Sequence, residues 1–204
     1  MEWNLKEIFP NKVLIGLTGG NAGGKSLAGR YFAALGLPLL DTDAIYHDLL
    51  ESDKDLINDL SRAFGREIAP GGCLNRAALS QKVFGNPALL PRLNEITHPK
   101  IAEALIERLK AESGKAAVIE ATLLFESGLS KGVHVTVTVT APPEKRLLRL
   151  MERNNLSRAE AEKRLLAQES DEYRVKQSDY VITNNGSRAD LERAVKNLVS
   201  RLGL

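Results

Sequence analysis

The residues best suited to chemistry lie in a short segment near the N-terminus, where glycines surround a lysine and a serine. The segment Gly19-Gly20-Asn21-Ala22-Gly23-Gly24-Lys25-Ser26 fits the pattern G-x-x-x-x-G-K-[ST] of a phosphate-binding loop, or P-loop. Glycines let such a loop wrap around an anion, so that backbone N–H groups and the positive end of the next helix face the phosphates. Lys25 can then reach the β- and γ-phosphates of a nucleotide, and the Ser26 hydroxyl can bind Mg²⁺.

The sequence on both sides of this segment supports the motif. The apolar residues 13–18 before it are typical of a buried parallel strand, and residues 25–35 after it have a helical pattern. A glycine-rich turn that contains Gly-Lys-Ser by chance is the alternative. A chance occurrence would not explain why a predicted strand precedes the loop and a predicted helix follows it. We therefore interpret the segment as a nucleotide-binding site.

A pair of aspartates follows the next predicted strand, in the sequence Asp41-Thr42-Asp43. Ligands of α/β proteins bind at the carboxyl ends of the strands. Phosphoryl transfer needs a group that takes or orients the proton of the acceptor hydroxyl, and Asp43 is placed to do this. Asp43 also opens the next predicted helix, so helix capping is its alternative role. Asp41 can equally cap or hydrogen-bond the loop.

Three further groups have both a functional and a structural interpretation. Glu120 ends another predicted strand. It is either a carboxylate near the metal or a strand-end charge that faces water, and the sequence favours neither interpretation over the other. His98 precedes Pro99, which alone explains a kink, so His98 either contacts a polar substrate or satisfies the kink. Arg149 and Arg153 share one helix face and are placed to converge on phosphates.

Composition limits the function classes. The chain has 204 residues, 43% apolar and 26% charged, and a net charge of +2, so no strong field indicates a nucleic-acid or membrane partner. Its single cysteine, Cys73, excludes an internal disulfide framework and fits the reducing cytoplasm. No apolar run is long enough to span a bilayer, and the N-terminus lacks the apolar core of a signal peptide.

Strand and helix patterns alternate along the chain, which predicts an α/β fold with a mainly parallel sheet. The expected strands are 13–18, 37–41, 116–120, 133–140 and 180–183, and the expected helices are 25–35, 44–51, 55–64, 76–84, 87–111, 143–154, 157–169 and 188–202. Ser157 and Ser187 are expected to cap the last two helices. The helical stretch between residues 41 and 116 is far longer than a simple crossover needs. It is therefore predicted to be an insertion that caps a substrate pocket, and residues 143–177 form a second helical block.

These motifs and their order resemble those of the dephospho-CoA kinase family over most of the chain. The resemblance rests on the P-loop, on Asp41-Thr42-Asp43, on residues 72–79 and 93–99, on Leu123-Leu124-Phe125-Glu126, on Asn184-Asn185-Gly186, and on Arg149, Arg153 and Gln168 in the lid pattern. It implies a single P-loop kinase domain with a five-stranded, mainly parallel sheet flanked by helices. A helical substrate-side insertion at about 44–114 and a helical lid at about 143–177 complete this domain.

The resemblance also implies an activity and a set of site residues. The expected reaction is ATP-dependent phosphorylation of the ribose 3′-hydroxyl of dephospho-coenzyme A, with Mg²⁺ as cofactor. The catalytic residues would be Asp43, Lys25 and Arg149, and Ser26 would bind the metal. ATP would be bound by Gly20 to Ser26, Leu27, Arg149, Arg153, Asn185 and Gly186. The acceptor would be bound by Asp43, Arg76, His98, Leu124 and Glu126. Whether Glu120 or Asp41 joins the metal stays open. A monomer or weak oligomer in the cytoplasm, without nucleic acid or membrane, is expected.

The chain departs from the family pattern at a few positions. Gly23 stands where a serine is usual, Leu27 where a threonine is usual, Asn75 where an aspartate is usual and Thr122 where a proline is usual. None of these removes Lys25, Ser26 or Asp43. The departures therefore bear on nucleotide affinity more than on the presence of activity.

Three other functions are alternatives. Shikimate kinase also combines a P-loop with Asp-Thr-Asp, but it uses a Gly-Gly-Gly element, and Pro70-Gly71-Gly72-Cys73 lacks the third glycine. A GTPase is disfavoured because the chain has no Asn-Lys-x-Asp motif. A nucleotide-sensing module without turnover is disfavoured because Asp43 accompanies Lys25.

Overall fold

A sheet of five parallel strands organises the larger part of the chain. The computed structural model describes residues 3–167 and 170–204. The strands β1 (Val13–Thr18), β2 (Leu39–Asp41), β3 (Ala116–Glu120), β4 (Val135–Thr140) and β5 (Tyr180–Thr183) lie in the order β2-β3-β1-β4-β5. Every neighbouring pair is parallel, so the carboxyl ends of the strands meet at one edge. That edge is where α/β proteins bind their ligands.

The register of the strands aligns the acidic and P-loop residues. In the centre of the sheet, Leu17 of β1 lies opposite Glu120 of β3. On the other side of β3, Asp41 lies opposite the same glutamate. The ends of β1, β2 and β3 therefore form one row across the sheet, just before the P-loop begins.

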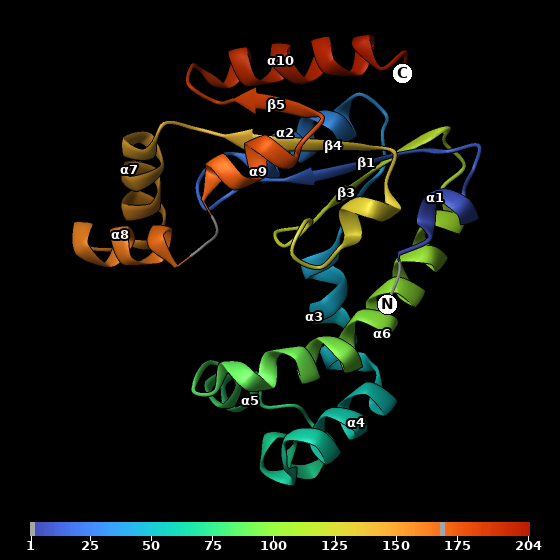
Figure 1. Cartoon of the computed structure of the whole chain (residues 1–204), viewed down its shortest axis with the longest axis vertical. Helices are drawn as coiled ribbons and strands as arrows, with labels where there is room; N and C mark the ends of the chain where they lie inside the picture. The colour runs from blue at the N-terminus through green and yellow to red at the C-terminus, as the bar shows by residue number, and fades with distance from the viewer. Residues whose placement is uncertain (1–2, 168–169) are drawn as a thin grey trace. The chain divides into compact units, whose positions relative to one another are not determined.

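Two helices cover one face of this sheet. The helices α2 (Lys25–Ala34) and α10 (Arg188–Arg201) pack together above the strands (Figure 1). Their apolar residues and those of the strands form the main core, which includes Ile15, Leu17, Ala28, Phe32, Val118, Val137, Val139, Ile182, Leu191 and Val195. The strands are β-branched and apolar because both faces of a parallel sheet are buried.

The opposite face is covered by α9 (Asp171–Gln177) and by the segment that follows β3. The Thr138 hydroxyl lies 3.4 Å from the carbonyl oxygen of Arg174 in α9. Leu124, in the segment after β3, lies directly against Gly16, where a Cβ atom would come within 3.0 Å of its methyl group. A glycine in the middle of β1 thus makes room for the chain that crosses this face.

Three other helices belong to the same part of the chain: α1 (Leu5–Ile8), α7 (Pro143–Asn154) and α8 (Arg158–Leu166). Between them α7 and α8 enclose a small core of Leu147, Leu150 and Ala161. The helix α8 begins at a capping box, in which Ser157 and Glu160 satisfy each other's backbone N–H groups. A 3₁₀ turn, η4 (Leu129–Gly132), precedes β4.

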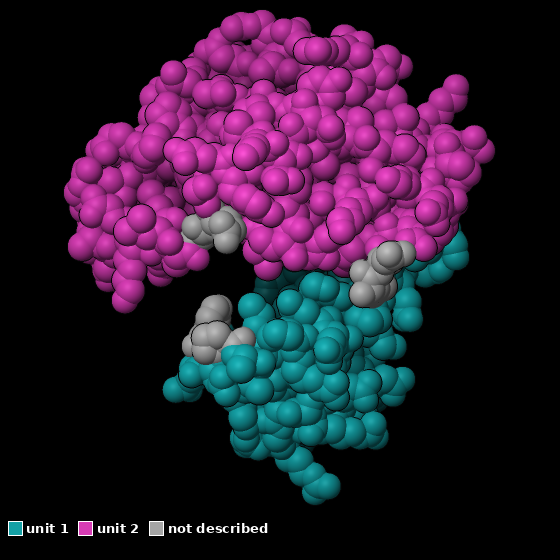
Figure 2. Space-filling view, viewed as in Figure 1, with its two compact units in different colours: residues 1, 42–111 teal, residues 2–41, 112–204 magenta. Residues whose placement is uncertain are grey.

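Residues 42–111 form a second compact unit, which is coloured teal in Figure 2. Its elements are α3 (Thr42–Ser52), α4 (Lys54–Phe64), α5 (Arg76–Phe84), α6 (Leu90–Ala111) and the 3₁₀ turns η1 (Arg66–Ile68), η2 (Pro70–Gly72) and η3 (Pro87–Leu89). Apolar side chains of α4, η1 and α5 build its separate core, with Leu56, Leu60, Phe64, Ile68, Leu79 and Val83 fully or almost fully buried. This unit therefore has a hydrophobic core of its own.

The predicted fold class is confirmed, and several local predictions need correction. The strands β2 and β4 begin at Leu39 and Val135, each two residues later than predicted. The helix α3 begins at Thr42, so Asp43 lies in its first turn and is not its N-cap. The helix α6 begins at Leu90, three residues later than predicted, and it continues through Pro99 as the predicted range 87–111 did. The helices α1 and α9 were not predicted, because they are only four and seven residues long. The end of the predicted helix 157–169 and the lid residue Gln168 lie outside the described residues.

The two predicted serine caps are confirmed, since Ser157 and Ser187 both accept a backbone N–H at the start of their helices. None of the helices that the structure describes is long and apolar enough to cross a membrane.

Candidate active site

The P-loop connects β1 to α2 in a conformation that its small residues permit. Gly24 adopts a left-handed conformation with φ of 107°, and Ala22 has φ of 58°. A Cβ atom on Gly19 would lie 2.3 Å from the carbonyl oxygen of Val139, so only glycine allows the loop to pass β4 this closely. The glycines of the motif are thus explained by positive φ at one position and by close approach at another.

The loop is held through its own carbonyl oxygens. Asn184, which is buried at the end of β5, donates from Nδ2 to the Gly23 carbonyl at 3.0 Å. Arg149 of α7 donates to the carbonyl oxygens of Ala22 and Asn184, each at 3.3 Å. These bonds fix the loop conformation from its carbonyl side. Arg149 is therefore a P-loop contact in this structure, and its predicted contact with the phosphates stays a prediction. Asn184 was not among the predicted site residues.

A second arginine of α7 also reaches the loop, and sequence reasoning did not select it. Arg146 is 8% exposed, donates from Nε to the Asn21 carbonyl at 2.9 Å, and forms an ion pair with Asp171 at 2.7 Å. Asp171 in turn accepts a hydrogen bond from the Thr140 hydroxyl. The sequence does contain a signal for the burial of Arg146, which is its helical spacing from Leu150. Residues four positions apart share one face of a helix, and Leu150 lies on the buried face of α7.

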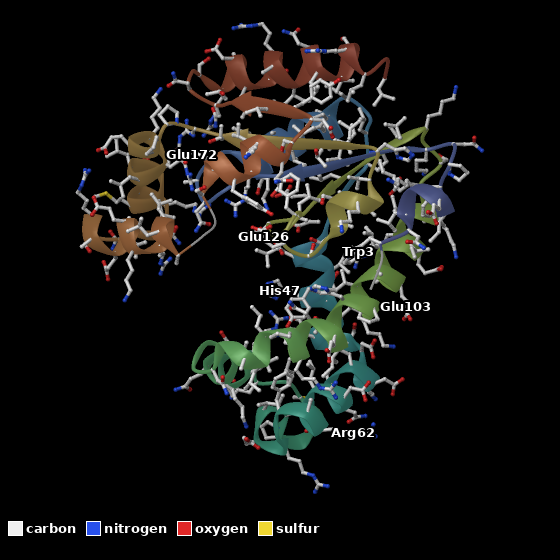
Figure 3. All side chains as sticks on the ribbon, viewed as in Figure 1. Trp3, His47, Arg62, Glu103, Glu126 and Glu172 are labelled. Atoms are coloured by element: carbon white, nitrogen blue, oxygen red, sulfur yellow. The ribbon has the colours of Figure 1, made fainter. Side chains whose placement is uncertain are left out.

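The ion-pair network extends to the segment after β3. Arg174 of α9 is 1% exposed, lies 3.9 Å from Asp171 and donates to Glu126 at 3.3 Å. Glu126 extends from that segment near α9 (Figure 3). The Leu-Leu-Phe-Glu segment is thus connected by charge to the residues that hold the P-loop.

The functional side chains of the motif meet at the end of β3. The Ser26 hydroxyl donates to Oε1 of Glu120 at 2.9 Å, and the Lys25 ammonium lies 3.7 Å from the same oxygen. Lys25 also donates to the Thr122 hydroxyl at 2.7 Å. Glu120 is 3% exposed, which excludes the interpretation of this residue as a strand-end charge facing water.

Helix α2 is shaped to admit this buried carboxylate. A Cβ atom on Gly29 would lie 2.8 Å from Oε2 of Glu120 and 3.0 Å from a methyl group of Leu39. Glycine in a helix interior is unfavourable by about 1 kcal/mol relative to alanine. Here the glycine makes space for a charge that Lys25 partly balances and that the Ser26 hydroxyl binds. Hard oxygen donors of this kind fit Mg²⁺, which commonly binds one or two carboxylates together with substrate phosphates.

The helical unit contains a different set of predicted residues. Asp43 is exposed in the first turn of α3. Arg76 of α5 makes two contacts with His47, one to Nδ1 at 3.0 Å and one to the His47 backbone carbonyl at 3.1 Å. Arg76 also donates to Glu51 at 2.6 Å. His47 points outward from α3 (Figure 3). The start of α5 is capped by Asn75, which accepts from the N–H of Ala78 at 3.1 Å, so the departure from aspartate preserves the cap.

A mainly apolar pocket of about 410 Å³ lies beside Arg76 within this unit. Its walls are Tyr46, His47, Leu50, Arg76, Leu79, Ser80, Val83, Leu90 and Leu93, from α3, α5 and α6. Leu90 is 47% exposed at this pocket. The pocket therefore offers an apolar surface with one arginine, which suits an extended apolar group that carries an acidic end.

Other predicted residues lie elsewhere. Leu124 is fully buried and packs against Gly16, and its contact with the acceptor stays a prediction. Arg153 is exposed, and its Nε donates to Asn154 at 3.1 Å. The Asn185 carbonyl accepts from Lys145 at the start of α7.

Two predicted residues have a packing environment that bears on their roles. Leu27 is half-buried and packs against the main core. His98 is half-buried in α6, and this burial lowers its pKa below the usual 6.5. His98 is therefore predominantly neutral near pH 7.

Known proteins resemble this chain along nearly all of its length. The model of the dephospho-CoA kinase family matches residues 13–190. The dephospho-CoA kinase of Corynebacterium diphtheriae is 39% identical over 92% of this chain and 96% of its own, and that of Dehalococcoides mccartyi is 39% identical over 91% and 95%.

Solved structures also resemble this chain over most of its length. A protein from Thermus thermophilus superposes with a TM-score of 0.83 at 36% identity, covering 94% of this chain and 98% of its own. Dephospho-CoA kinase from Campylobacter jejuni gives a TM-score of 0.68 at 27% identity, covering 93% and 96%. A shikimate kinase from Bacteroides thetaiotaomicron, with a TM-score of 0.56 at 17% identity over 94% and 99%, shares the fold alone. With its P-loop, the buried Glu120 and these matches, the chain belongs to the dephospho-CoA kinase family.

Proposed function

We propose that this protein transfers the γ-phosphoryl group of ATP to the ribose 3′-hydroxyl of dephospho-coenzyme A, the last step of coenzyme A biosynthesis. The observation that carries the proposal is the cluster of Lys25, Ser26 and Glu120 at the mouth of the P-loop. Family membership supports the identity of the acceptor.

The nucleotide would bind along the P-loop. The backbone of residues 20–27 would surround the phosphates, with Lys25 at the β- and γ-phosphates. Asn185 and Gly186, after β5, would border the adenine. Arg149, which already binds the Ala22 carbonyl, would lie beside the phosphates when the lid segment closes.

The metal would bind next to Ser26. The Ser26 hydroxyl would be a direct ligand, and Glu120 supports it through the bond at 2.9 Å. A Mg²⁺ ion held there would neutralise the charge that develops on the phosphate oxygens. Asp41 lies opposite Glu120 in the sheet register and is a further carboxylate at this edge.

The acceptor would be bound by the helical unit. Its apolar pocket of about 410 Å³ fits the pantetheine arm, and Arg76 beside it fits an acidic group of the substrate. His98 and Glu126 remain proposed acceptor contacts. Asp43 would take or orient the proton of the 3′-hydroxyl as that oxygen attacks the γ-phosphorus, and the bond from this phosphorus to the ADP oxygen breaks. The lid residue Arg153 would approach the phosphates only after closure.

The direct test is product analysis. Purified protein with Mg-ATP and dephospho-coenzyme A should form ADP and coenzyme A in equal amounts. Phosphate must appear on the ribose 3′-oxygen, which phosphorus NMR of the product reports. Phosphorylation of shikimate, with none of dephospho-coenzyme A, would contradict the proposal. The monomeric state and the cytoplasmic location stay predictions, which gel filtration with light scattering and cell fractionation check.

A further inference from the structure

The position of the Lys25 ammonium is set by a group that the P-loop motif does not contain. Its Nζ atom donates to the Thr122 hydroxyl at 2.7 Å, within normal hydrogen-bond distance. The nearest Glu120 oxygen is 3.7 Å away, a distance that allows attraction between charges but no direct hydrogen bond. Thr122, and not the carboxylate, therefore provides the directional bond of the lysine in this structure.

Thr122 is itself held on a fixed backbone. The N–H of Ala121 donates to the Leu17 carbonyl of β1 at 3.0 Å. The Thr18 hydroxyl donates to the Thr122 carbonyl at 3.3 Å. Two contacts to the end of β1 thus fix the residues just after β3. The strand β1 also leads into the P-loop. The same strand therefore helps to fix the positions of both Thr122 and Lys25.

We propose that Thr122 is a positioning residue for Lys25, whose hydroxyl holds the ammonium in place for the phosphates of the nucleotide. This inference rests on the proposed binding of ATP by the P-loop. A lysine has three N–H donors, so the bond to Thr122 leaves two for phosphate oxygens. A lysine that is already oriented loses less side-chain freedom when the nucleotide binds.

The Thr122 hydroxyl also keeps the Lys25 ammonium from moving closer to the Glu120 carboxylate. Both side chains are shielded from water, with 12% and 4% exposure respectively, so a closer ion pair between them would be strong. Without the Thr122 hydroxyl, the ammonium would move toward the carboxylate, and the phosphates would have to displace it. Oε1 of Glu120 also accepts from Ser26, so such a move would disturb the proposed metal ligand as well.

The test compares substitutions that separate the hydroxyl from the shape of the residue. Thr122→Val keeps the branched shape and removes the hydroxyl, and it should raise the Kd for ADP and the KM for ATP about three- to tenfold. Thr122→Ser keeps the hydroxyl and should bind nucleotide as the natural protein does. Thr122→Ala repeats the test without the added methyl group, in case the valine disturbs folding. The KM for dephospho-coenzyme A should not change.

A double-mutant cycle identifies the residue through which Thr122 acts. In the Lys25→Met background, Thr122→Val should have no further effect on the Kd for ADP. The proposal is overturned if Thr122→Val and Thr122→Ala bind ADP normally. It is also overturned if Thr122→Ser is as weak as these two, or if the loss persists in the Lys25→Met background. Failure of the proposed function would appear differently, since the natural protein would then form no coenzyme A.

Discussion

Asp43 has two possible roles that a single substitution separates. It lies exposed in the first turn of α3, where a carboxylate stabilises the helix by about 0.3–1 kcal/mol through the helix dipole. If Asp43 also takes or orients the substrate proton, Asp43→Asn should lower kcat by about 10²–10⁴. The Kd for ATP should change little. Steady-state kinetics and calorimetric titration with ATP give these two quantities.

The matched control for this experiment is Asp48→Asn on the same helix. Asp48 pairs with Arg108 on the protein surface at 2.6 Å, so the control variant should keep kcat. A normal kcat in Asp43→Asn would leave that residue only its contribution to the helix.

His134 makes stability depend on pH. Its Nδ1 accepts the N–H of Leu14 at 3.1 Å, so the ring must be unprotonated at this nitrogen. Burial, and then the charge of Lys6, lowers the pKa of His134 below its usual 6.5. The unfolded chain therefore binds a proton more readily than the folded chain. Stability is full above about pH 6.5 and falls as the pH falls below it.

The size and origin of this effect are measurable. Because the His134 side chain is largely exposed, we expect a loss below about 1 kcal/mol. Urea unfolding at about pH 7.5 and about pH 5.5 measures it. His134→Asn keeps an acceptor near Leu14 without the titration, so the loss should shrink. The remainder should come from His98, whose pKa is lowered by burial. An unchanged loss in His134→Asn would assign the dependence to other groups.

Helix α7 carries two kinds of arginine, and their substitution should have different consequences. Arg146 is buried and paired with Asp171, so Arg146→Met leaves a shielded carboxylate without its closest cation. We expect a loss of about 3 kcal/mol in the free energy of unfolding. Arg153 is exposed on the same helix, so Arg153→Met should leave the stability unchanged and lower only kcat/KM. Thermal unfolding together with kinetics distinguishes the two.

The opposite pattern would change the interpretation of this helix. If Arg146→Met is as stable as the natural protein, the ion pair does not hold α7 against the P-loop. If Arg153→Met has normal kcat/KM, Arg153 belongs to a solvated helix face, and Arg149 is the lid arginine that remains at the loop.

The molecule as a whole is proposed to bind its two substrates with different units. This proposal predicts that a substitution in the apolar pocket affects one substrate only. Leu90 lines that pocket and is 47% exposed, so Leu90→Gln should fold normally. It should raise the KM for dephospho-coenzyme A several-fold, because burial of a leucine side chain contributes about 1.5–3 kcal/mol when complete. The KM for ATP should not change.

A leucine-sized residue of similar exposure provides the control for that test. Ile8 on α1 is 46% exposed and lies outside the pocket, so Ile8→Gln should alter neither KM. Equal effects of the two substitutions, or a larger effect of Leu90→Gln on ATP, would contradict the assignment of the pocket to the acceptor.

The sequence alone determined the features that depend on local pattern. The alternation of strands and helices, the P-loop and the serine caps each involve residues close together in the chain, where spacing and side-chain type are sufficient. The prediction of β1, β3 and β5 was correct to the residue. The start of α3 was wrong by two residues, because the helix follows β2 without a separate capping residue.

Tertiary structure decided which side chains surround the loop. Ser26 meets Glu120 across 94 positions of sequence, and Arg146 meets Asn21 across 125. Such pairs depend on the strand order and register, which bring the end of β3 beside the end of β1. Periodicity places Arg146 on a buried helix face, but only packing shows that this face meets a backbone carbonyl and Asp171. The sequence thus determined which residues could bind phosphate, and the fold decided which partners orient them.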